Sequence, residues 1–173
     1  MGWNLSGLIP GDNGITSTVN AIRQAVYYSL RNFPQVRAQA ELITMGLPER
    51  DELAEANSVY DWVVRHYRFL KDPRGIEMVK SPEISLKEIA QYGMFQGDCD
   101  DVSALLAALL AAIGYKTMLV VISVPGKGAE YRHIFPRVYL PKRGVWLTLE
   151  ATCRKKPLGW EAPNGRAREY PLY

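Results

Sequence analysis

The sequence predicts an α+β domain in which N-terminal helices precede a buried helix that packs on a small antiparallel sheet. Three observations predict this fold. Apolar residues recur with helical spacing in the first third of the chain, an alanine- and leucine-rich segment ends at Gly114, and three apolar segments separated by short turns follow it. Helices followed by strands are typical of α+β proteins. At 173 residues the chain is long enough for one hydrophobic core.

Three amphipathic helices are expected before residue 75. Residues 19–33 carry apolar side chains at three- and four-residue steps, and Thr16 or Ser17 is placed to cap the start of this helix. A second helix is expected over 34–45, because proline opens it and glycine follows it. The third has its apolar face over 53–70 and ends at a Lys-Asp-Pro segment.

A buried helix is expected to begin at Cys99. A short helix over 85–91 precedes it, with Ser85 as its cap and Gly93 at its end. Asp98 is then in the N-cap position and Asp101 is the third helical residue, which is the arrangement of a capping box. The helix continues through the apolar residues 104–113.

The remaining apolar segments, 115–124, 130–140 and 145–150, are predicted strands of an antiparallel meander. The chain is then divided into an N-terminal helical extension (1–48), a core (49–152) and a C-terminal tail (153–173) within one compact domain. The tail is rich in proline, glycine and arginine, so it is expected to be loose or to lie on a partner.

The composition argues against several classes of protein. The formal net charge is only +3 and most basic residues are scattered, so nucleic acid is not a favoured partner. The longest apolar run, 104–124, is interrupted at its centre, which predicts no membrane span. Residues 1–10 lack the features of a secretory signal, so a cytoplasmic location is expected.

Three residues in separate elements carry the candidate chemistry: Cys99, His133 and Glu150. Cys99 lies in the first helical turn, where unpaired N–H groups and the helix dipole favour a thiolate, although the neighbouring aspartates oppose it. His133 lies in the second predicted strand, whose alternation places Tyr131, His133 and Phe135 on one face. Glu150 ends the next strand, where its carboxylate can orient the imidazole.

The other candidate ligands and nucleophiles favour structural interpretations. His66 lies beside the apolar face of the third helix, which indicates a packed histidine. Cys153 has no partner motif and is interpreted as a bystander. The spacing of cysteines and histidines does not fit a structural zinc site, so no metal and no cofactor are expected.

The segment 97–115, a Gly-Asp-Cys turn followed by a leucine-rich helix, glycine and a strand, resembles the nucleophile helix of the transglutaminase-like superfamily, which has a papain-like core. His133 and the residues after it resemble the histidine strand of that family, and 146–152 resembles its acid-bearing strand. The likeness covers about 54–152 and is closest to phage or bacterial members. Glu150 stands where the family usually has aspartate, and Pro136 lies close to the histidine.

The resemblance implies acyl transfer through a Cys99–His133–Glu150 triad and a thioester, with hydrolysis of protein or peptide amides ranked above cross-linking. The Cys99 N–H, with Gln91 or Gln96, is expected to stabilise the oxyanion. The alternative is a non-catalytic structural or assembly protein on the same scaffold. In that case virion or assembly subunits are the partners, and the protein is a virion component of a phage.

Overall fold

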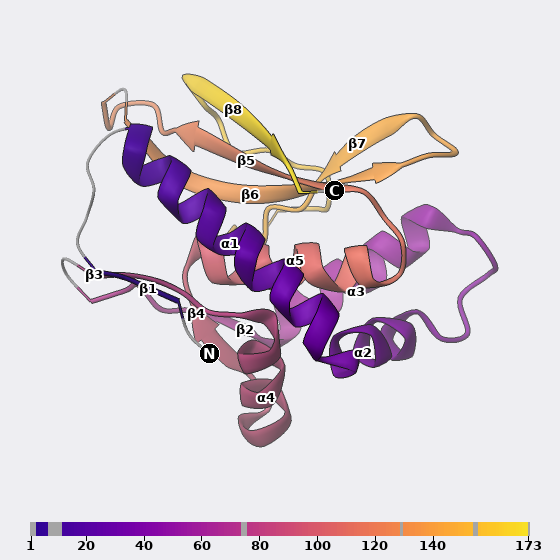
Figure 1. Cartoon of the computed structure of the whole chain (residues 1–173). Coiled ribbons are helices and arrows are strands. Elements are labelled where there is room, and N and C mark those ends of the chain that lie inside the picture. The colour runs from indigo at the N-terminus through magenta and orange to yellow at the C-terminus, as the bar shows by residue number, and fades with distance from the viewer. Residues whose placement is uncertain (1–2, 7–11, 74–75, 129, 154–155, 173) are drawn as a thin grey trace.

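A computed structural model describes residues 3–6, 12–73, 76–128, 130–153 and 156–172 of the chain (Figure 1). Its helices form a layer below a twisted sheet, which is drawn in orange and yellow in Figure 1. The helices are α1 (Asp12–Asn32), α2 (Pro34–Thr44), α3 (Glu52–His66), α4 (Pro82–Tyr92) and α5 (Cys99–Ala112). The strands are β1 (Trp3–Ser6), β2 (Tyr67–Phe69), β3 (Ile76–Val79), β4 (Phe95–Gly97), β5 (Thr117–Ser123), β6 (Tyr131–Leu140), β7 (Val145–Thr148) and β8 (Arg166–Pro171).

The main sheet has the strand order β7-β6-β5-β8, and all of its neighbouring strands are antiparallel. The predicted meander is therefore confirmed in β5, β6 and β7. The fourth strand was not predicted: β8 comes from the segment interpreted as a tail, and it pairs with β5 from Met118↔Pro171 to Ser123↔Arg166. Because β5 is buried along its whole length, both of its edges need a hydrogen-bonding neighbour, and β8 supplies the second.

The predicted buried helix is α5, which lies at the centre of the molecule. All of its side chains from Asp100 to Leu110 are buried. The helices α1, α2, α3 and α4 pack around it, and β6 covers another side. This arrangement confirms the α+β fold class. In the part of the chain that the structure describes, no helix combines the length and the apolar character needed to cross a membrane.

Three helix boundaries differ from the prediction. α1 begins at Asp12, before the expected caps Thr16 and Ser17. α4 begins at Pro82 after Ser81, because proline is favoured in the first helical turn, and Ser85 is buried inside the helix. The C-terminal prediction for α4 is confirmed, since Gly93 takes the left-handed conformation (φ 78°) that favours glycine at a helix end.

The third difference lies nearest to Cys99. α3 ends at His66, and the next three residues form β2, which runs parallel to β4. The rings of Tyr67 and Phe95 pack against each other across this pair with their centroids 5.3 Å apart. Pairing with β4 therefore overrides the helical spacing that continues to residue 70 in the sequence. The β2–β4 pair leads the chain directly into the start of α5.

Candidate active site

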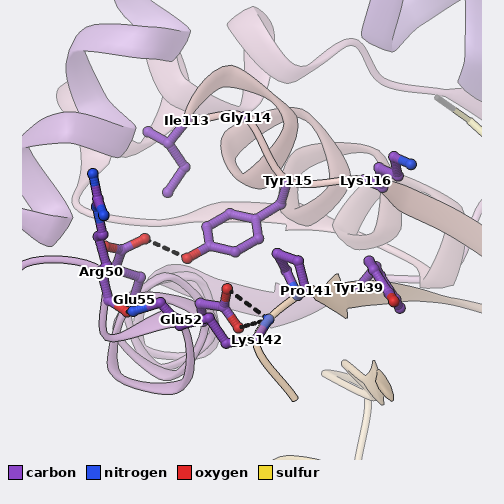
Figure 2. Close-up of a pocket in the computed structure, with 10 residues that line it drawn as sticks. All are labelled: Arg50, Glu52, Glu55, Ile113, Gly114, Tyr115, Lys116, Tyr139, Pro141 and Lys142. Atoms are coloured by element: carbon purple, nitrogen blue, oxygen red, sulfur yellow. Dashed lines mark hydrogen bonds between the residues drawn. The ribbon is translucent and has the colours of Figure 1, made fainter. Parts of the chain in front are cut away.

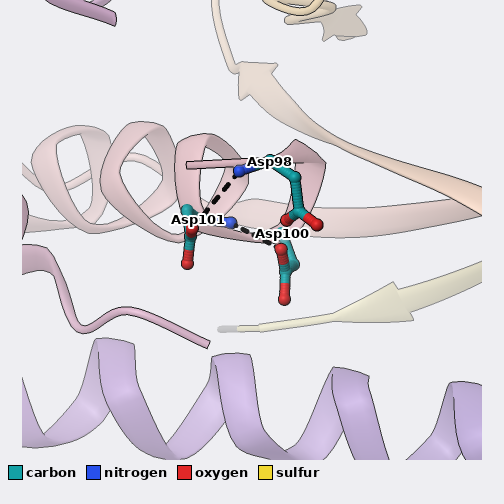
Figure 3. Close-up of side chains that lie close together, drawn as sticks. All are labelled: Asp98, Asp100 and Asp101. Atoms are coloured by element: carbon teal, nitrogen blue, oxygen red, sulfur yellow. Dashed lines mark hydrogen bonds between the residues drawn. The ribbon is translucent and has the colours of Figure 1, made fainter. Parts of the chain in front are cut away.

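Cys99 is the first residue of α5, and the loop before it is tightly constrained (Figure 3). The Asp98 N–H donates to Oδ2 of Asp101 at 3.3 Å, which is one half of the predicted capping box. The Lys80 N–H donates to the other carboxylate oxygen of Asp101 at 2.6 Å. A Cβ atom on Gly97 would lie 2.2 Å from Oδ2 of Asp101, so only glycine fits there. These contacts fix the position of the Cys99 backbone.

Asp98, Asp100 and Asp101 bring one oxygen each within 4.8 Å of one another, a spacing that a metal ion can use. Backbone N–H groups engage both oxygens of Asp101, and the Asp101 N–H donates to Oδ1 of Asp100 at 3.0 Å. Burial raises the pKa of Asp101 to about 6, although the hydrogen bond from the Lys80 N–H and the positive charge of Lys80 both act to lower it. The bonds of Asp98 and Asp101 are those of a helix cap, which favours acidic residues at the start of a helix.

His133 and Glu150 are in direct contact. Nε2 of His133 lies 2.5 Å from Oε2 of Glu150, and the two side chains are only 16% and 1% exposed. The second oxygen of Glu150 accepts hydrogen bonds from the N–H and the hydroxyl of Thr152, at 3.0 and 2.5 Å. The structure thus brings together two of the three predicted site residues.

The Glu150 carboxylate is held ionised by these partners. Burial alone would raise its pKa, but the hydrogen bond and charge of His133, with the bonds from Thr152, outweigh it and hold the pKa of Glu150 below its usual value. An ionised carboxylate only accepts hydrogen bonds, so Nε2 of His133 must carry the proton in this contact. In the neutral ring, Nδ1 is then the nitrogen with the free lone pair.

The sheet register explains why a glutamate reaches His133. β6 and β7 pair as Arg137↔Thr148, and the Leu149 N–H continues the ladder by donating to the Pro136 carbonyl at 3.0 Å. Continued by one residue, this register puts Glu150 opposite Phe135, so His133 is its diagonal neighbour. Diagonal pairs on one face are about 7–8 Å apart, which suits a long side chain.

Pro136 does not interrupt the pairing of β6 with β5. The N–H and C=O groups of one residue in an antiparallel strand point to the same side, and the Pro136 carbonyl bonds to Leu149 beyond β7. The missing N–H of Pro136 therefore faces the end of β7, where the ladder stops. The proline removes one hydrogen bond at a strand end and leaves the His133 contact in place.

A β-bulge changes one predicted detail of β6. Ile122 pairs with His133, whereas Ser123 pairs with Tyr131, so Arg132 is an extra residue in the strand. The rings of His133 and Phe135 pack with centroids 5.9 Å apart, but Tyr131 packs against the main core instead. The prediction that all three share one face is therefore wrong for Tyr131, because a bulge interrupts alternation and re-aims the side chains beside it.

Two contacts place this part of β6 beside the start of α5. The Ser103 hydroxyl donates to the Cys99 carbonyl at 2.5 Å and lies 3.4 Å from the carbonyl oxygen of Ile134, the residue after His133. On the helical side, the Tyr60 hydroxyl donates to the Glu150 carbonyl at 2.7 Å. Burial and the nearby Glu150 charge raise the pKa of Tyr60 to about 12. The backbone at Ile134 and Glu150 therefore lies beside the helical layer, while the His133 ring packs on Phe135.

The other residues named in the sequence analysis lie on α3, on α4, on β4 and in the segment after Glu150. Gln96 is exposed on β4, three residues before Cys99, and Gln91 is exposed on α4. His66 stacks on Trp62 with ring centroids 4.5 Å apart, and its Nδ1 lies 2.7 Å from the Trp62 carbonyl oxygen. Cys153 is a half-buried thiol after the Glu150 segment.

A pocket of 370 Å³ lies at the other end of α5 (Figure 2). The Tyr115 hydroxyl donates to Glu55 inside it, and both Glu52 oxygens accept the Lys142 N–H at 3.0 Å. α5 has 14 residues and is therefore about 20 Å long. A molecule in this pocket would be too far from Cys99 to react with it.

A cysteine at the start of a buried helix, packed on an antiparallel sheet that carries a His–Glu pair, is the layout of the papain-like class. The family model of the transglutaminase-like superfamily matches residues 39–151, about two thirds of the chain. The chain therefore belongs to the transglutaminase-like superfamily, for which cysteine-dependent acyl transfer on protein or peptide substrates is typical.

Solved structures with low sequence identity share the fold. A candidate protease from Parabacteroides distasonis aligns with a TM-score of 0.55 and 12% identity, over 88% of this chain and 29% of that chain. A candidate cysteine protease from Cytophaga hutchinsonii aligns with a TM-score of 0.50 and 13% identity, over 79% of this chain and 46% of that chain. The chain thus spans less than half the length of either structure. A search of curated protein sequences finds no match.

Proposed function

We propose that this protein is a cysteine-dependent amidase or peptidase in which Cys99 is the nucleophile, His133 the base and Glu150 the group that orients the base. The observation that carries the proposal is the 2.5 Å contact between Nε2 of His133 and the buried Glu150 carboxylate. It leaves Nδ1 as the proton acceptor, on the edge of the ring opposite Glu150. A carboxylate that fixes the tautomer of a base is the third member of a nucleophilic triad.

The proposed reaction has two halves. Nδ1 of His133 takes the thiol proton, and the sulfur of Cys99 attacks the carbonyl carbon of the substrate amide. The tetrahedral intermediate collapses as the C–N bond breaks, and the imidazolium returns the proton to the leaving amine. In the second half His133 takes a proton from water, the hydroxide attacks the thioester, and the Cys99 thiol is released with the carboxylic acid.

The start of α5 suits the charge that develops in this reaction. The N–H of Cys99 belongs to the first helical turn, where N–H groups have no partner within the helix and the dipole favours negative charge. We assign this N–H to the oxyanion, with the exposed Gln96 amide as a second donor. We rank hydrolysis above transfer to an amine, in keeping with the two structural neighbours named as candidate proteases.

The test is acyl transfer from a generic activated ester, p-nitrophenyl acetate. The reaction is monitored through the release of nitrophenol and through mass spectrometry of the protein. We expect an acetyl group on Cys99, followed by turnover that is lost in Cys99→Ser and retained in the matched control Cys153→Ser. Acetylation at other residues, with a rate that is unchanged in Cys99→Ser, would contradict the proposal. A scaffold role in a larger assembly would then be the better interpretation.

A further inference from the structure

Two arginines of β8 lie over one aromatic ring of β6. The guanidinium carbons of Arg166 and Arg168 are 5.4 and 5.0 Å from the centre of the Tyr131 ring. Arg166 and Tyr131 both pair with Ser123 of β5, so they lie at the same level of the sheet on either side of the central strand. We call Tyr131, Arg166 and Arg168 the arginine shelf.

The shelf lies beyond the N-terminal end of α5. Near its start, α5 contacts β6 through Ser103 and Ile134. Past its other end, the Tyr139 N–H donates to the Lys116 carbonyl at 2.9 Å. α5 thus follows β6 from residue 134 towards 139, and Tyr131, which precedes Ile134, extends past the first turn. Cys99 is one turn, about 5–6 Å, before Ser103 along the helix, so it lies towards the shelf.

The charge of Arg166 is accessible to solvent, and Arg168 is half-buried. Arg166 is exposed, and within the described residues its guanidinium forms no hydrogen bond or ion pair. Of the acidic residues at the start of α5, Asp100 and Asp101 are only 1% and 3% exposed and are bonded to backbone N–H groups, whereas Asp98 is half-buried. Arg166 therefore places an exposed cationic group on this side of the site.

We propose that the arginine shelf binds a carboxylate group of the substrate whose amide is attacked by Cys99. A guanidinium held over an aromatic ring is restricted in position, and its fork of N–H donors matches the two oxygens of a carboxylate. The shelf then selects peptides that carry an acidic group close to the scissile amide. This inference rests on the proposed function, but it concerns β8, which lies outside the residues matched by the family model.

The test compares two thiol reagents of nearly equal size, the anionic iodoacetate and the neutral iodoacetamide. The rate of Cys99 alkylation by each is followed by mass spectrometry, and the ratio of the two rates removes any change in thiol reactivity itself. For a guanidinium about 8 Å from the reagent in a water-like dielectric, each arginine favours iodoacetate roughly twofold. The double variant Arg166→Gln/Arg168→Gln is therefore expected to lower the ratio about fourfold at low salt.

The matched control is Arg31→Gln/Arg37→Gln, which removes the same charge from the end of α1 and from α2. We expect it to keep the wild-type ratio, and we expect the shelf effect to shrink at about 0.5 M salt as screening increases. Circular dichroism and thermal unfolding check that the double variant still folds. If the two double variants give the same ratio, the shelf does not bind carboxylates.

This outcome is separate from a failure of the proposed function. If the proposed function fails, iodoacetamide alkylates Cys99 at the same rate in the wild-type protein and in His133→Ala, whatever the ratio of the two reagent rates. A ratio that falls only in the shelf variant supports the inference.

Discussion

Changing Glu150 to glutamine tests the role of this residue without changing its size. The wild-type carboxylate accepts from Thr152 at one oxygen and from His133 at the other. A glutamine has only one oxygen, so its NH₂ group must face one of these partners. If the oxygen stays with Thr152, the NH₂ group donates to Nε2 of His133 and the ring proton moves to Nδ1. The nitrogen that we assign as the base is then occupied.

The expected cost follows from these contacts. A base held in the wrong tautomer removes general-base catalysis, which contributes roughly 10²- to 10⁴-fold to a rate. If the amide instead turns its oxygen to His133, its NH₂ group faces the Thr152 N–H, and a lost buried hydrogen bond costs about 1–3 kcal/mol of stability. Shortening the side chain by one carbon in Glu150→Asp would open the 2.5 Å contact to about 4 Å, beyond hydrogen-bond reach.

The assay is the rate of acetyl transfer from p-nitrophenyl acetate at neutral pH, with thermal unfolding measured in parallel. We expect both Glu150 variants to lose at least a hundredfold in rate. Glu161→Gln is the matched control, because Glu161 lies before β8 and pairs with Arg137 of β6 at 2.6 Å, and no bond joins it to His133. Wild-type rates in Glu150→Gln, together with wild-type thermal stability, would refute the orienting role of this carboxylate.

Three further predictions concern stability. Gly97→Ala should lower the free energy of unfolding by about 3 kcal/mol or more in a denaturant titration, because its Cβ would overlap the Asp101 side chain, whereas Gly165→Ala meets only a flexible hydroxyl at 3.3 Å and should cost far less. Since the pKa of Asp101 is raised to about 6, the folded protein holds this proton more tightly than the unfolded chain does. The free energy of unfolding should therefore fall by up to about 3 kcal/mol as pH rises from about 4 to 6, and Asp101→Asn should flatten this decline. Tyr60→Phe leaves the buried Glu150 carbonyl without its 2.7 Å donor and should cost about 1–3 kcal/mol, measured by the same titration; an unchanged midpoint would contradict this.

Local sequence signals predicted the centre of the fold well. The capping residues Asp98 and Asp101 and the apolar body after them identify α5, because a helix start and a buried helix both depend on residues close in sequence. The order of β6 and β7 followed from the short turn between them. That order also predicted that Glu150 would lie beside His133.

Elements that depend on distant partners were not predictable. The sequence of β8 alternates weakly and is rich in arginine, and it forms a strand because β5 needs a neighbour on its second edge. β2 continues a helical pattern and is a strand only because β4 lies beside it. The bulge at Arg132 leaves no sequence signal, so neither the orientation of Tyr131 nor its contact with Arg166 could be foreseen.

The most direct test of the central claim is the pH-dependent rate of iodoacetamide alkylation at Cys99, in the wild-type protein and in His133→Ala, with Cys153 as an internal reference. If Cys99 and His133 exchange a proton as proposed, Cys99 reacts far faster than Cys153 at about pH 6–7, and this advantage disappears in His133→Ala. A Cys99 that is as slow as Cys153, or that keeps its rate without His133, would contradict the proposed triad.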